Sequence, residues 1–162
     1  MLKAIASIIF FVFIFFFIEY FIFNDMAPWL KPDLLLLLTM FLTLSLGIRF
    51  GLLTAVVCGV LRDSFGLGLF GVHIFSYLIS AYMTAILRKH VYIVSVQWFR
   101  FVIATIVSLI NVFIVTIFTL MRSPIDWGHF WGHVALPEVG MTVLAVSLTF
   151  DFLKKCVSKF FV

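Results

Sequence analysis

The residues that could do chemistry in this chain are few and stand in apolar surroundings. Seven acids, eleven Lys or Arg and four histidines occur among 162 residues, of which 65% are hydrophobic. Acid–base hydrolysis needs two positioned carboxyl groups, and a nucleophile needs a base within reach. No two acids form a close pair in the sequence; they are Glu19, Asp25, Asp33, Asp63, Asp126, Glu138 and Asp151. The sequence predicts no enzyme, and an intramembrane enzyme is the least favoured class.

The densest group of candidate residues is Arg62-Asp63 and the glycine-rich segment that follows, up to Gly71. The uncharged stretch before it, Phe50–Leu61, has 12 residues. As a helix it would cover about 18 Å, well short of a hydrocarbon core of about 30 Å. We therefore expect a loop that starts at Arg62 and dips below the membrane surface. Asp63 would there bind Arg62, His73 or the N–H groups of the loop. The open alternative is that both charges end the helix in water and headgroups.

Other polar residues carry weaker signals. Glu19 and Asp151 each lie about one turn from the end of an apolar run, and we interpret both as boundary residues. Asn111 falls in the middle of an apolar run, where an amide should bind a Ser or Thr of another helix.

The histidines do not predict a metal site. His129 and His133 are four residues apart, the spacing of two ligands on one helix face. Glycines beside them argue against a firm helix, and no third ligand is obvious except Asp126 or Glu138. With Trp127 and Trp131 they resemble an interfacial belt. We expect no metal and no cofactor.

Composition identifies the class of protein. Only 11% of the residues are charged, against about 25% in soluble domains, and the mean hydropathy is +1.28. We predict an all-α membrane protein, a polytopic bundle of about six transmembrane helices forming a single domain over residues 1–162. The expected spans are residues 4–23, 33–48, 50–62, 72–87, 101–121 and 134–153. Basic residues are scattered without a dense stripe, so membrane lipid is an expected partner and nucleic acid is not.

The basic residues predict the topology. With six spans and an inside N-terminus, eight Lys or Arg fall inside and three outside. This bias follows the positive-inside rule, so both termini should be cytoplasmic. If spans two and three formed one long bent helix, the later loops would change sides and the bias would break.

Small residues predict close helix packing. Small residues recur every four positions on the third expected span, at Gly51, Ala55 and Gly59. The next span has the same spacing of small residues, at Ser76, Ser80 and Thr84. Packing within the chain is the favoured interpretation and a subunit interface the alternative. A large side chain at Gly59 should disrupt this contact. The leucine run at residues 34–38 is interpreted as lipid-facing, so Leu36→Ala is expected to be mild.

These features together resemble a known family. Lys31-Pro32-Asp33 before leucines, a glycine-spaced helix that ends in Leu61-Arg62-Asp63, glycines at 66 and 71, and the stretch from Tyr77 to Tyr82 are similar to the bacterial rod shape-determining MreD family. The resemblance covers about residues 28–88. Its candidate interaction or structural residues are Pro32, Asp33, Gly51, Gly59, Arg62, Asp63, Gly66, Gly71 and Tyr77.

The resemblance implies a non-enzymatic scaffold of the cell-elongation machinery in the bacterial inner membrane. The implied partners are an MreC-like bitopic protein, peptidoglycan synthases and, indirectly, the MreB filament system. The family's six-helix arrangement also resembles the S-components of energy-coupling-factor vitamin transporters. The alternative function is therefore a small-molecule-binding transporter subunit. On the scaffold interpretation, Asp63→Ala should impair function more than Asp25→Ala.

Overall fold

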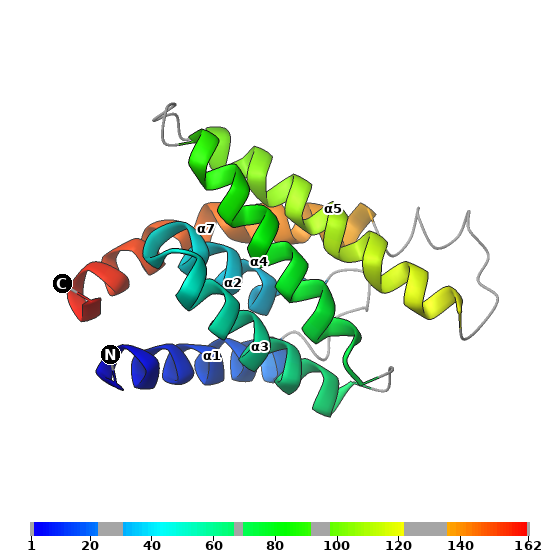
Figure 1. Cartoon of the computed structure of the whole chain (residues 1–162), viewed down its shortest axis with the longest axis horizontal. Coiled ribbons are helices and arrows are strands. Elements are labelled where there is room, and N and C mark those ends of the chain that lie inside the picture. Colours follow the sequence, from blue (N-terminus) through cyan, green and yellow to red (C-terminus); the bar gives the residue numbers. More distant parts are fainter. Residues whose placement is uncertain (1, 23–30, 67–69, 92–97, 122–135, 162) are drawn as a thin grey trace.

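The computed structural model describes residues 2–22, 31–66, 70–91, 98–121 and 136–161, and within them it contains six α-helices and no strand. The predicted all-α class is confirmed for this part of the chain. The helices are α1 (Leu2–Ile22), α2 (Leu34–Leu46), α3 (Ile48–Phe65), α4 (Val72–Val91), α5 (Trp98–Leu120) and α7 (Leu136–Phe161) (Figure 1).

One described helix, α5, is long and apolar enough by itself to cross a membrane. The qualifying segment is Phe101–Leu120, with a mean hydropathy of 2.6. Shorter apolar segments occur at Ala6–Ile22, Leu34–Leu46 and Leu136–Val146.

The chain reverses between α2 and α3 at a single residue, Gly47. Its φ of 98° lies in the left-handed region that glycine adopts without strain. On one side of the turn, a side chain at Gly51 would collide with the side chain of Thr43. At the far ends of the pair, Arg62 contacts Asp33 at 2.9 Å. These contacts run in antiparallel order, so α2 and α3 are two separate helices and not one long bent helix.

The third helix is longer than its uncharged stretch. α3 spans 18 residues, about 27 Å at 1.5 Å per residue, and Arg49, Arg62 and Asp63 are all helical. The expectation that a loop begins at Arg62 is wrong. Charged side chains do not end a helix when other elements supply their partners, as α1 and α2 do for Arg62.

The core of the fold is α2, which contacts each of the other five described helices. All residues from 34 to 43 are buried, and the run Leu34–Leu38 is at most 5% exposed. The interpretation of this run as lipid-facing is therefore wrong. A helix that is apolar all round fits lipid or a protein centre equally well, and here five neighbours surround it.

This placement reverses the expected effect of Leu36→Ala. Leu36 is 2% exposed, and its removal would leave a cavity in the centre of the bundle. We expect the free energy of unfolding to fall by about 2–3 kcal/mol, the low end of the range for leucine truncation in cores. Thermal unfolding in mild detergent measures it. Leu109→Ala, on α5 at 39% exposure, is the matched control and should cost much less.

The small-residue stripe of α3 packs within the chain. Gly51 faces Thr43 of α2, and Gly59 faces the backbone of Ile74 on α4. Ala55 between them is fully buried. Ser76, Ser80 and Thr84 on α4 are also buried. Both small-residue faces are thus occupied by neighbouring helices of the same chain.

Candidate functional site

Asp33 begins α2 and is the most connected polar residue in the described structure. Pro32 precedes the N-cap position, and the Asp33 carboxylate caps the helix by accepting from Leu36 N–H at 2.9 Å. The backbone N–H of Asp33 donates to Thr142 Oγ1 of α7 at 3.1 Å. Asp33 is only 2% exposed, so these bonds form away from solvent.

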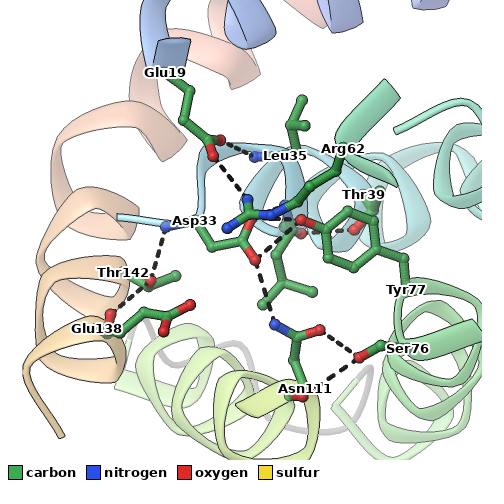
Figure 2. Close-up of polar contacts among 11 residues, drawn as sticks. Glu19, Asp33, Leu35, Thr39, Arg62, Ser76, Tyr77, Asn111, Glu138 and Thr142 are labelled. Atoms are coloured by element: carbon green, nitrogen blue, oxygen red, sulfur yellow. Dashed lines mark hydrogen bonds and ion pairs between the residues drawn. The ribbon is translucent and has the colours of Figure 1, made fainter. Parts of the chain in front are cut away.

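Three further side chains converge on the same carboxylate, as Figure 2 shows. Arg62 of α3 donates to Oδ1 at 2.9 Å. The hydroxyl of Tyr77 on α4 lies 2.8 and 3.0 Å from the two oxygens. Asn111 of α5 donates to Oδ2 at 3.3 Å. The charge is therefore satisfied by a cation and neutral donors from three helices, which a buried carboxylate requires.

Arg62 links this centre to α1. Its Nη1 also donates to Glu19 Oε1 at 2.7 Å, and Glu19 Oε2 accepts from Leu35 N–H at 3.3 Å. Glu19 is 5% exposed. Its interpretation as a boundary residue is wrong, because the carboxylate turns inward to the guanidinium of α3.

Asn111 and Ser76 join α5 to α4. The Ser76 hydroxyl donates to Asn111 Oδ1, with a longer contact of 3.4 Å to the Asn111 carbonyl. The predicted pairing of Asn111 with a Ser or Thr of another helix is confirmed. On α7, Thr142 donates to the carbonyl of Glu138 at 2.8 Å while accepting from Asp33. The amide and hydroxyl groups thus extend the network to the far helices.

Each of the six described helices contributes to this network, which we call the Asp33 network: Glu19, Asp33, Arg62, Ser76, Tyr77, Asn111 and Thr142. The oxygens of Asp33 accept from the Leu36 N–H, Arg62, Tyr77 and Asn111, so its acceptor capacity is used within the fold. A carboxylate held in this way orders helices; it is poorly placed to take a proton from a substrate.

Asp63 forms a second, separate centre. Its Oδ2 accepts from the N–H groups of Gly71 at 2.8 Å and Ile74 at 3.2 Å, and its Oδ1 from the N–H of His73 at 3.2 Å. Of the expected partners, the backbone N–H groups are the ones found, while Arg62 turns to Glu19 and Asp33. Asp63 therefore caps the N-terminus of α4 from the C-terminal turn of α3.

Asp63→Ala should weaken the junction between α3 and α4. Three buried or half-buried N–H groups would lose their acceptor, at about 1–3 kcal/mol in the free energy of unfolding. Asp63→Asn keeps one carbonyl oxygen and should cost less. Ser64→Ala, at the exposed neighbouring position, is the control. Unfolding in mild detergent measures the effect. An alanine variant as stable as the Ser64 control would contradict the capping role.

The other predicted positions are structural in this arrangement. The N–H of Gly66 donates to the Arg62 carbonyl at 2.8 Å and ends α3. Gly71 has a φ of 102°, which lets its N–H face Asp63. Tyr77 is fully buried in the Asp33 network. Asp126, Trp127, His129, Trp131, His133 and the side chain of Asp151 lie outside the described part of the chain. Within it, no group of three or more His, Cys, Asp or Glu could hold a metal.

A small cavity of about 210 Å³ opens beside the Glu19–Arg62 pair. Its polar lining includes Lys31 and His73, and its aromatic lining includes Tyr20 and Phe65. Pockets for drug-sized ligands measure about 300–1,000 Å³. This cavity is smaller.

Comparison with known proteins identifies the family. The model of the family described as rod shape-determining protein MreD matches residues 1–156, well beyond the segment that carries the sequence resemblance. No curated protein and no solved structure matches the chain. The match takes in every described helix, including the whole Asp33 network and most of α7. The chain belongs to the MreD family of rod shape-determining proteins.

Proposed function

We propose that this protein is a non-enzymatic scaffold that crosses the bacterial inner membrane six times, with both termini in the cytoplasm. Family membership gives a role in rod shape determination. The scaffold would couple an MreC-like bitopic protein and the peptidoglycan synthases of the elongation machinery to the MreB filament system.

The direction of the helices supports the six-span arrangement. The Asp33 network lies towards the C-terminal ends of α1 and α3 and the N-terminal ends of α2, α4 and α7. Phe118, near the end of α5, contacts Phe75, near the start of α4. Successive helices therefore run in opposite directions. The start of α1 and the end of α7 lie on the same side in Figure 1. The excess of basic residues belongs to that side, which the positive-inside rule makes cytoplasmic.

Exposed aromatic side chains support contact with lipid. Phe10, Phe13, Phe17 and Phe21 follow one face of α1 and are 55–62% exposed. Contiguous apolar surface of this kind indicates a membrane or a protein partner. In a bilayer, these phenylalanines would face acyl chains while α2 stays enclosed.

The observation that carries the scaffold proposal is the Asp33 network itself. A buried carboxylate whose oxygens accept from groups on several helices rigidifies a fold, and its own oxygens are already used by those groups. A vitamin-transporter subunit would bind its ligand in a pocket on the outer side of the membrane. On that side of the bundle, the observation in favour of this alternative is the cavity at Glu19 and Arg62. The volume of this cavity, about 210 Å³, lies below the usual range for a small-molecule site, so the scaffold is favoured over the transporter subunit.

A topology experiment tests the membrane part of the proposal. A reporter active only in the periplasm should be silent when fused after Val162 and active when inserted near Trp127. The reverse pattern would reject the arrangement.

A partner experiment tests the scaffold part. The protein is expressed in a rod-shaped bacterium depleted of its own family member, and cell shape and co-purification of the bitopic partner are measured together. Restored rods with partner retained are the expected result. Rods restored without any association, or tight retention of a vitamin by the purified protein, would overturn the scaffold in favour of another role.

A further inference from the structure

A second, larger cavity lies at the opposite end of the bundle from the Asp33 network. It measures about 510 Å³ and is lined by Ile48, Tyr82, Ala85, Ile86, Arg88 and Lys89. We propose that this cavity, the basic cavity, binds the headgroup of an anionic phospholipid. The inference rests on the six-span topology proposed above.

The cavity lies where the cytoplasmic membrane surface would be. Ile48 is the first residue of α3, and Arg88 and Lys89 are in the last turn of α4. Arg62, the α3 residue of the Asp33 network, is near the other end of that helix. The start of α3 and the end of α4 lie on the same side of the bundle as the chain ends in Figure 1. Basic pockets between helices on this side of a membrane are sites for anionic headgroups.

The charge at this end has no internal counterpart among the described residues. The ion pairs among the described residues, those of Arg62 with Glu19 and Asp33, both lie at the opposite end of the bundle. The acids with described side chains are at the other end of the bundle, at positions 19, 33, 63 and 138. Within the described part, the Arg88 guanidinium makes one hydrogen bond, to the Thr43 carbonyl at 3.5 Å. Its fork of donors and the exposed Lys89 ammonium therefore suit a phosphate.

The apolar lining favours a lipid over a soluble phosphate. Tyr82, Ile86 and Lys89 are spaced i, i+4, i+7 and follow one face of α4, with the cation nearest the helix end. Tyr82 is 54% and Ile86 38% exposed, and Ile48 across the cavity is 40% exposed. Tyr82 and Ile86 offer apolar surface on the side of the membrane interior, and Lys89 adds a cation at the helix end, so the lining changes from apolar to cationic in the direction from acyl chain to phosphate.

Unfolding of the full-length purified protein in detergent tests the site. Phosphatidylglycerol should raise the unfolding temperature and be retained in native mass spectrometry, whereas phosphatidylcholine and inorganic phosphate should not. Lys89→Gln should weaken phosphatidylglycerol binding about fivefold, and adding Arg88→Gln should weaken it further. Because Arg88 also contacts the end of α2, the single Lys89 variant keeps the test independent of folding.

Lys31→Gln is the matched control, since Lys31 lines the cavity at the opposite end. It should bind phosphatidylglycerol like wild type. Equal binding by wild type and Lys89→Gln would overturn the site. So would equal effects of phosphatidylglycerol and phosphatidylcholine, or stabilisation by inorganic phosphate alone, or by an acidic peptide in place of lipid. Reporter fusions that reverse the topology would reject the six-span proposal separately, because lipid retention by the purified protein does not depend on its orientation.

Discussion

Replacing Asp33 with alanine is expected to destabilise the bundle by roughly 3–5 kcal/mol, the range for removing one partner of a buried ion pair. Arg62 would keep only Glu19, and the Tyr77 hydroxyl, the Asn111 amide and the Leu36 N–H would lose an acceptor. Folded proteins have about 5–15 kcal/mol of stability in all, so a large part would be lost. The measurements are the unfolding midpoint in mild detergent and the abundance of the protein in membranes.

Two further variants, Asp33→Asn and Glu138→Gln, distinguish the loss of the Asp33 hydrogen bonds from the effect of removing the charge of any buried acid. Asparagine keeps one oxygen for capping and should fall between wild type and alanine. Glu138 offers its backbone carbonyl to Thr142, a bond that glutamine retains. Its variant should stay close to wild type. Comparable losses in Glu138→Gln and Asp33→Ala would show that the Asp33 hydrogen bonds contribute nothing particular.

The second large effect is expected at Gly59. A Cβ there would lie 2.5 Å from Ile74 Cα and 2.8 Å from Ile74 N. Those atoms are backbone, so α3 and α4 must separate to admit even alanine, and Gly59→Leu should prevent normal accumulation. Separation would also pull Asp63 from the N–H groups it caps. Membrane abundance and rescue of rod shape measure the outcome.

Gly140→Ala is the matched control for Gly59→Ala. Gly140 lies inside α7, and an added Cβ would meet no atom within 4 Å in the described structure. Alanine in a helix interior is favoured over glycine by about 0.5–1 kcal/mol, so this variant should be neutral or slightly more stable. Normal accumulation and activity of Gly59→Ala would contradict the close approach of the two helices.

Local signals in the sequence were sufficient for the fold class and for the kind of partner that Asn111 has. Apolar runs with charges between them predicted helices. An amide in an apolar run predicted a Ser or Thr partner for Asn111. Each of these follows from what a buried backbone or amide group requires, whatever the rest of the fold.

Long-range partners were beyond the sequence. Glu19 and Arg62 are 43 positions apart, so nothing in either apolar run indicated that they pair. An acid near the end of one run and a single arginine in another were the available signal, and charge balance within the membrane could have linked them. The extent of α3 is not predictable from its uncharged stretch for the same reason, because the partners that hold Arg62 within the helix lie on α1 and α2.

The leucine run shows a different limit. A segment that is apolar on all sides satisfies lipid and protein equally, and no periodicity distinguishes them. The leucine run of α2 faces protein because five helices surround it, and their number becomes known only once the helices are arranged in space.

The most direct test of the Asp33 network is a double-mutant cycle between Asp33 and Arg62, measured as unfolding free energy in mild detergent. The cycle compares wild type, Asp33→Asn, Arg62→Gln and the double variant. Because the two side chains share one contact of 2.9 Å, the double variant should be far less destabilised than the sum of the singles, with a coupling within about 0.5–3 kcal/mol. Additive losses would mean that the two residues act independently, and would contradict a single network that joins the helices.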